Sequence, residues 1–192
     1  MRRLLLRCIE FFKHYGREWD KLSPTEKEAI EFAHKNINPE PPVKVSENKY
    51  SWQYYLAHYG DSIVNPHFRR DDLDKDDKEV IAGINKITTN CDMVLYRGVH
   101  DEIWEKMRKN AKNIPGIDLI EKSVMQTCLV KGCEIKTDHR LRIFVPKGSH
   151  AVYLGNVNKE QYWYEVDIQC GANLKIVSMD ETYINCVLIS TK

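Results

Sequence analysis

The sequence predicts an α+β fold, because its helical patterns lie in the first half of the chain and its strand patterns in the second. Up to about residue 90, apolar residues recur at helical spacing between proline- and glycine-containing breaks. Beyond residue 92, short β-branched and aromatic runs alternate with turns such as PKGS and QCGAN. Helices followed by strands, rather than alternating with them, are typical of α+β domains. Because no linker separates two cores, we expect a single domain over residues 1–192.

The first half is expected to contain several helices. Residues 1–16 carry apolar residues at helical spacing, which predicts a helix packed on the domain or appended to it; a basic amphipathic helix at a membrane surface is the alternative. A second helix should start with Ser23 as its N-cap and Pro24 in its first turn. Its expected apolar face is formed by Ala29, Ile30 and Ala33.

Two further helices are predicted before the strands begin. Residues 51–60 form an aromatic-rich helix that should end near Gly60. The acidic run 71–77 precedes an apolar stripe formed by Val80, Ile81, Ile84 and Ile87. Negative charge is favoured at a helix N-terminus, so we interpret this run as a solvated helix start rather than as a metal site.

The second half is expected to consist of strands, with one helix over residues 101–111. The predicted strands are residues 93–99, 123–130, 140–146, 150–155, 162–168, 174–180 and 184–191. These runs are short, β-branched or aromatic, and separated by turn residues, which is typical of strands.

Composition limits the classes of function. The net charge of +1 gives no global argument for a nucleic-acid or membrane partner. No stretch approaches the ~20 apolar residues of a membrane span, and the start of the chain lacks the features of a signal peptide. The six cysteines have neither zinc-ligand nor CxxC spacing, which favours reduced thiols and a cytosolic site of action.

Three residues in the strand half are candidates for chemistry. Arg97 ends the run VLYRG, Thr127 lies in SVMQTCL, and Glu165 lies in YWYEVDI. An arginine at a strand end needs an anionic partner, and its planar guanidinium binds phosphate or carboxylate through paired hydrogen bonds. A carboxylate in a desolvated cleft can stabilise a developing positive charge.

Six stretches, taken in order, resemble one known family. They are WDKLSPTEKEAI, YYLAHYGDSIVNPHFRR, DMVLYRGV, EKSVMQTCLV, IFVPKGSHAVYLG and YEVDIQCGANLKIV. Together they resemble the ADP-ribosyltransferases of the arginine–serine–glutamate class, especially the bacterial exotoxins and the small phage enzymes. The resemblance covers the chain from about residue 17 to its end.

The resemblance implies a fold, a reaction and a set of site residues. The fold would be N-terminal helices followed by a split two-sheet β core. The activity would be mono-ADP-ribosyl transfer from NAD, as substrate, to a macromolecule, with release of nicotinamide and without a metal. The implied catalytic residues are Glu165, Arg97 and Thr127, and the implied NAD-binding residues are Arg97, Gly98, Tyr96, Asn65, Arg69, Thr127 and Gln126.

The resemblance also implies a biological setting. A monomeric toxin, effector or phage enzyme is expected, acting in the cytosol after delivery into a host cell. Its acceptor would be a protein, with a nucleic acid as the alternative.

The sequence departs from the family in two places. Trp163 stands two residues before Glu165, where the family has a glutamate or glutamine that recognises the acceptor. Gln161 is the nearest substitute, and in an extended strand Gln161, Trp163 and Glu165 would share one face. In the second motif, Gln126 and Cys128 replace two serines.

Three alternatives follow from these departures. The first takes Glu165 and Asp167 as the acidic pair, and we disfavour it because Gly171 then follows four rather than six residues later. The second takes water as the acceptor, which would make the protein an NAD glycohydrolase. A degenerate fold used as a binding module is the third alternative.

Overall fold

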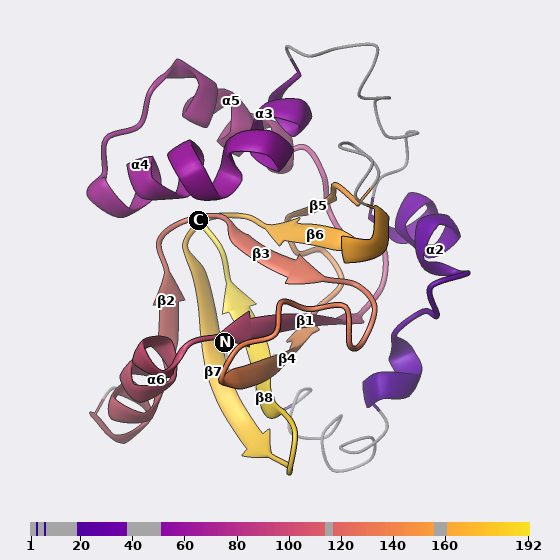
Figure 1. The fold of residues 1–192 in the computed structure, drawn as a ribbon, viewed down its shortest axis with the longest axis vertical. Helices are drawn as coiled ribbons and strands as arrows, with labels where there is room; N and C mark the ends of the chain where they lie inside the picture. Colours follow the sequence, from indigo (N-terminus) through magenta and orange to yellow (C-terminus); the bar gives the residue numbers. More distant parts are fainter. Residues whose placement is uncertain (1–2, 4–5, 7–18, 38–50, 114–116, 156–160) are drawn as a thin grey trace.

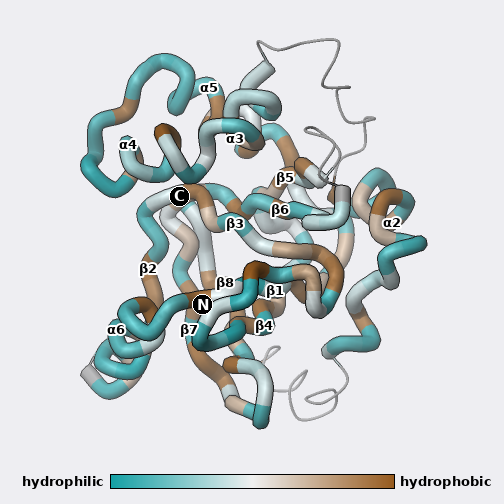
Figure 2. The backbone as a smooth tube through the Cα atoms, in the orientation of Figure 1, coloured by the Kyte–Doolittle hydropathy of each residue, from teal (hydrophilic) through white to brown (hydrophobic). Residues whose placement is uncertain are grey.

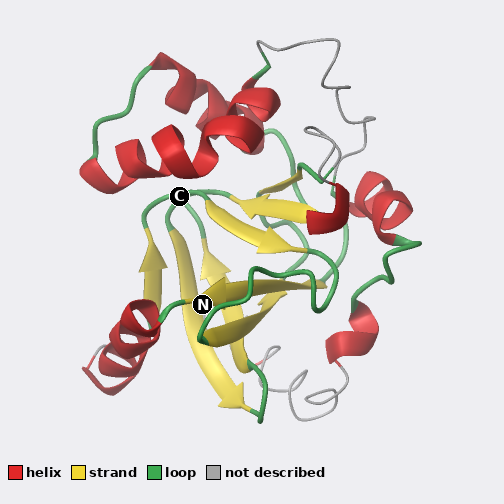
Figure 3. Ribbon diagram, in the orientation of Figure 1, coloured by secondary structure: helices red, strands yellow, loops and turns green. Residues whose placement is uncertain are grey.

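The computed structural model describes residues 3, 6, 19–37, 51–113, 117–155 and 161–192, apart from the side chains of Asn113 and Gln161. Figure 3 shows helices arranged around the outside of a strongly curved sheet. The α+β prediction is therefore confirmed. Of the helix predicted over residues 1–16, only Arg3 and Leu6 are described, and both are helical; the rest of that prediction lies outside the described residues.

Eight strands form one hydrogen-bonded sheet within the described part of the chain. In sheet order they run β2-β7-β8-β4-β1-β3-β6-β5. Their bounds are β1 Met93–Val99, β2 Leu119–Glu121, β3 Met125–Cys128, β4 His139–Val145, β5 Ala151–Tyr153, β6 Glu165–Ile168, β7 Ala172–Met179 and β8 Ile184–Ser190. The β4–β8 pair is parallel and the other pairs are antiparallel.

The sheet consists of two groups of strands with different directions. Figure 1 shows β2, β7 and β8 running across the direction of β3, β5 and β6. The two groups are joined edge to edge through the β4–β1 pair. The split β core is thus present, with a hydrogen-bonded connection between its halves.

The helix after Ser23 begins later than predicted. A 3₁₀ turn, η1 (Trp19–Leu22), precedes Ser23, and the helix α2 spans Ala29–Asn36. The Ser23 hydroxyl does not cap α2, because it donates to the Tyr96 hydroxyl at 2.9 Å. The predicted apolar face is correct for Ala29 and Ala33, which are buried, but Ile30 is exposed.

The next helices form one nearly continuous segment above β3 and β6 (Figure 1). They are α3 (Trp52–Tyr59), the π-helical turn η2 (Gly60–Val64) and α4 (Asn65–Arg70), followed by α5 (Lys75–Ile84). Ser51 caps α3 by accepting from the Tyr54 backbone N–H at 3.1 Å. The α-helix ends at Tyr59, in agreement with the predicted end near Gly60, and the chain continues from Gly60 as the π-helical turn η2.

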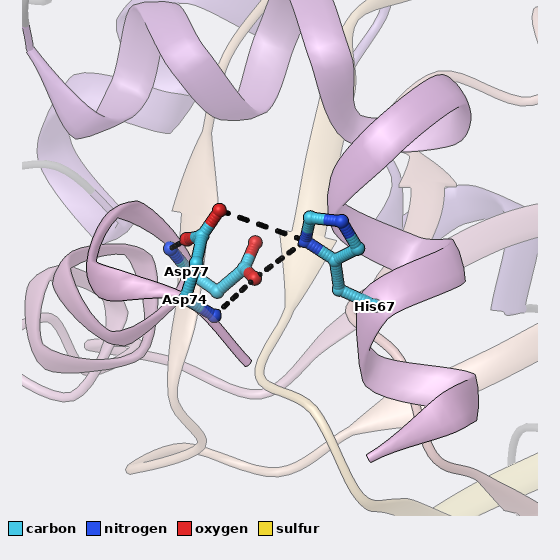
Figure 4. Close-up of side chains that lie close together, drawn as sticks. All are labelled: His67, Asp74 and Asp77. Carbon is cyan, nitrogen blue, oxygen red and sulfur yellow. Dashed lines mark hydrogen bonds and ion pairs between the residues drawn. The ribbon is translucent and has the colours of Figure 1, made fainter. Parts of the chain in front are cut away.

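The acidic run before α5 is more than a solvated helix start. Asp74 and Asp77 form a capping box, and the Asp77 side chain is fully buried. The ring nitrogen Nδ1 of His67 lies 2.8 Å from Oδ2 of Asp77 and 3.7 Å from Oδ2 of Asp74, as Figure 4 shows. These three side chains could hold a metal ion by their spacing. The capping box and the histidine contact already account for their arrangement, which clamps α4 to α5.

Three buried clusters hold the elements together. The largest lies between the sheet and the helices α2 and α6 (Asp101–Asn113), the second under α3 to α5, and the third around Trp19, Tyr96 and Phe144. In Figure 2, α6 is mostly hydrophilic, which fits its single fully buried residue, Met107. Among the described residues, no helix has the length and apolar content needed to cross a bilayer.

Candidate active site

A cleft of about 460 Å³ opens where β1, β3 and the start of β6 meet the segment α3–η2. This volume is within the range of about 300–1,000 Å³ that is common for small-molecule sites. Seven of the residues predicted for the site line it: Tyr96, Arg97, Gly98, Gln126, Thr127, Trp163 and Glu165. The structure therefore brings the three separate sequence motifs to one place.

Arg97 has a protein partner that the sequence did not reveal. Its Nη2 lies 3.3 Å from Oε2 of Glu121, and the two side chains are only 19% and 10% exposed. Burial lowers the pKa of Arg97, and the charge of Glu121 opposes that change. Glu121 is held in turn by Ser123, whose hydroxyl donates to its Oε1 at 2.7 Å. The guanidinium is thus fixed at the cleft wall before any ligand arrives.

Gln126 connects the arginine to the glutamate. Its backbone carbonyl accepts from Nη1 of Arg97 at 3.4 Å, and its side-chain Nε2 donates to Oε1 of Glu165 at 3.4 Å. Thr127 was expected to hold the glutamate, but its hydroxyl donates to the backbone carbonyl of Val166. The residue that contacts Glu165 from β3 is therefore Gln126.

Glu165 is the first residue of β6, and an irregular segment leads into it. Residues Gln161–Trp163 form a 3₁₀ turn, η3, and Tyr164 has a φ of 44°. The predicted extended strand from residue 162, with Gln161, Trp163 and Glu165 on one face, is therefore wrong in this part. Trp163 nevertheless lines the cleft beside Glu165. The side chain of Gln161 lies outside the described part of the chain.

The two site residues predicted in the segment that forms α4, Asn65 and Arg69, are not among the residues that line the cleft. Asn65 is buried and its Nδ2 lies 3.5 Å from Oε1 of Gln126. Arg69 is exposed and its Nη2 lies 3.5 Å from the Ser123 hydroxyl. Asn65 therefore contacts Gln126, which contacts Glu165, and Arg69 contacts Ser123, which holds Glu121, the partner of Arg97. The π-helical turn instead brings Asp61 to the cleft, which sequence periodicity gave no means of finding.

Gly98 is required for the approach of the loop between β3 and β4. A Cβ at this position would lie 2.0 Å from the Ile135 carbonyl oxygen and 2.5 Å from Oγ1 of Thr137. Gly98 was expected to admit a ligand, and the structure shows that the loop backbone takes the space. Ile135 and Thr137 themselves line the cleft.

We expect Gly98→Ala to lower the free energy of unfolding by about 1–3 kcal/mol, because the backbone of the loop must move away from β1. Urea unfolding followed by circular dichroism measures the change. Adding Thr137→Ala should not restore stability, since the closer clash is with a backbone oxygen. A wild-type unfolding midpoint for Gly98→Ala would contradict this packing.

The cleft combines a hydrogen-bond donor with an acceptor. The guanidinium of Arg97 is mostly buried and lines the cleft together with Glu165 and Gln126. A fixed guanidinium suits anionic or hydroxyl oxygens, and a carboxylate suits hydroxyl groups. The cleft can therefore bind a ligand that carries both kinds of group.

Comparison with solved structures identifies proteins of similar fold. Plx2a, an ADP-ribosyltransferase toxin from Paenibacillus larvae, superposes with a TM-score of 0.61 at 18% identity, over 86% of this chain and 96% of that one. The C3 exoenzyme of Clostridium limosum gives a TM-score of 0.62 at 17% identity, with the same coverage. C3stau2 from S. aureus, solved with NAD, gives 0.61 at 16% identity, again over 86% and 96% of the two chains.

Sequence comparisons add nothing to this likeness. No protein-family model matches the chain, and no curated protein sequence matches it. At identities of 16–18%, the superpositions establish the fold alone. The chain has the α+β fold of the bacterial ADP-ribosyltransferase toxins.

Proposed function

We propose that this protein is a mono-ADP-ribosyltransferase that transfers ADP-ribose from NAD to a macromolecule. The observation that carries the proposal is the position of Gln126, whose backbone contacts Arg97 and whose side chain contacts Glu165 in one cleft. These are the two residues that the family resemblance implies for catalysis. The shared fold supports the same conclusion independently of the motifs.

Each residue has a defined task in this proposal. Arg97, held by Glu121, binds an anionic part of NAD and orients it. Glu165 accepts hydrogen bonds from the ribose hydroxyls and stabilises the positive charge that develops as the bond to nicotinamide breaks. Gln126 fixes the orientation of Glu165, and Thr127 fixes the β3–β6 pairing through its bond to Val166.

The acceptor is proposed to be a protein that meets the η3 turn. Tyr162 is 60% exposed and Trp163 is 37% exposed, and their ring centroids are 5.2 Å apart. Exposed aromatic pairs of this kind are typical of protein-binding surfaces. Gln161 remains the candidate polar contact to the acceptor. The proposed setting is a cytosolic target, with the protein acting as a toxin, effector or phage enzyme.

We expect Trp163→Ala to reduce transfer to the acceptor by at least about tenfold, which is the loss expected for an interface hot spot. Its effect on NAD hydrolysis should be smaller, because NAD is held by Arg97 and Glu165. Tyr162→Ala is the matched comparison, since Tyr162 is more exposed and does not line the cleft. Labelled NAD measures transfer and hydrolysis together, and equal losses in both reactions would contradict a role of Trp163 in acceptor recognition.

Incubation with NAD labelled in the adenylate part and with a cell lysate tests the function itself. Label on macromolecules supports transfer, and sensitivity of that label to protease supports a protein acceptor. Release of free ADP-ribose alone would favour an NAD glycohydrolase, which Trp163 in the acceptor-recognition slot also favours. Intact NAD would favour a binding module and refute the proposal.

A further inference from the structure

Asp167, next to the candidate site on β6, is a buried ionisable group to which the mechanism above assigns no role. Asp167 is fully buried, and it does not line the cleft. It lies two residues after Glu165 on β6, and residues two apart in a strand face the same side. Val166, between them, packs into the main core on the other side. Glu165 and Asp167 therefore face the helices α3 to α5 together.

No donor among the described residues satisfies the Asp167 carboxyl group. Neither of its oxygens has a hydrogen-bond donor as a partner. The amide of Gln126, the residue paired with Asp167 across β3, donates to Glu165 instead. On its own side of β6, Asp167 has a second carboxyl group as its neighbour, that of Glu165. Two carboxyl groups can share a hydrogen bond only if one of them carries a proton.

The surrounding charges determine which form of Asp167 is stable. Glu165 on the same strand and Asp61 on η2 are negative, while Arg97 on β1 is positive and paired with Glu121. Burial is the main cause that raises the pKa of Asp167 well above its ordinary value. The neighbouring carboxyl groups of Glu165 and Asp61 raise this pKa further, and the positive charge of Arg97 lowers it. An ionised carboxylate that is buried without a donor would be strongly destabilising.

We propose that Asp167 is a positioning residue that stays protonated in the folded protein and donates its carboxyl hydrogen to Glu165. Of the two carboxyl groups, only that of Glu165 lines the cleft, so Glu165 keeps the negative charge. Glu165 then accepts one hydrogen bond from Gln126 and one from Asp167. A neutral acid kept in an apolar site can serve as a hydrogen-bond donor at neutral pH. This inference rests on the proposed function, because it assigns Asp167 a part in orienting the carboxylate that acts on NAD.

Two substitutions separate a neutral donor from a charged group. Asp167→Asn keeps a neutral donor of the same shape, whereas Asp167→Val fills the site without a donor. We expect the kcat of NAD cleavage to stay within about threefold for Asp167→Asn and to fall about tenfold or more for Asp167→Val, with KM changing less. Without the donor, ionised Glu165 is less favoured, so the acid limb of the kcat profile should move to higher pH in Asp167→Val only.

The competing result is equally specific. If Asp167 were ionised, Asp167→Asn would remove a negative charge beside Glu165 and move the acid limb to lower pH. That shift, or equal losses of kcat in both variants at wild-type urea stability, would overturn the proposal.

A readout independent of activity is the carboxyl ¹³C resonance of Asp167 in the labelled wild-type protein. It should have the protonated chemical shift at pH 7, and an ionised shift there would overturn the proposal even if NAD cleavage is confirmed. If the protein does not cleave NAD, the proposed function fails. The resonance of Asp167 in the wild-type protein and the resonance of Glu165 in the two variants then test the hydrogen bond independently of activity.

Discussion

Replacing Glu165 by glutamine is expected to lower the rate of NAD cleavage by at least about 10²–10³-fold, the loss seen when one preorganised electrostatic contact to a transition state is removed. Glutamine has nearly the same shape and can still contact Gln126, so the fold should be unaffected. It lacks the negative charge that opposes the developing cation on the ribose. Release of nicotinamide from NAD, followed by chromatography, measures the rate, and saturation with NAD separates kcat from KM.

Glu102→Gln is the control for this substitution. Glu102 is exposed on α6 and is not among the residues that line the cleft. It should cleave NAD at the wild-type rate. Undiminished turnover in Glu165→Gln would show that the charge of this residue is not used in the reaction.

Replacing Arg97 by alanine is expected to destabilise the protein by about 3–5 kcal/mol, in addition to abolishing NAD binding. The cause is Glu121, which is only 10% exposed on its side chain and would lose the positive partner 3.3 Å away. Breaking a buried ion pair on one side leaves an uncompensated charge, and that is the main source of the loss. Urea unfolding measures stability, and titration calorimetry with NAD measures binding.

The double variant Arg97→Met, Glu121→Gln separates the two effects. A neutral glutamine can still accept from Ser123, as Glu121 does. Most of the lost stability should therefore return, while NAD binding stays absent. If Arg97→Ala unfolds at the wild-type urea concentration, the ion pair has no structural role. If the double variant binds NAD normally, Arg97 is not a binding residue.

The sequence predicted the core of the site because its residues lie at fixed places in regular strands. The run 93–99 is a strand with the predicted bounds, and this places Arg97 near its end. Glu165, Gln126 and Thr127 were found in the same way, from short motifs in order along the chain. In the structure, the strands that carry these motifs are neighbours in the sheet, because β3 pairs with both β1 and β6.

The errors arise where a tertiary contact overrides a local preference. Ser23 has the sequence context of an N-cap, yet its hydroxyl bonds to Tyr96, which is 73 positions away. Residues 162–164 alternate like a strand but form a turn, in which Tyr164 adopts a φ of 44°. Glu121 could not be paired with Arg97 from sequence, because a charge partner across strands has no periodic signature.

The pairing of Arg97 with Glu121 has a consequence for selectivity. Small inorganic anions such as phosphate or sulfate would have to displace the Glu121 carboxylate from Arg97, and they would make few other contacts in the cleft. A long ligand can contact several residues of the cleft at once. Its binding therefore depends less on Arg97, which is already paired with Glu121. We therefore expect the cleft to bind phosphate or sulfate weakly and to favour ligands long enough to contact both Arg97 and Glu165.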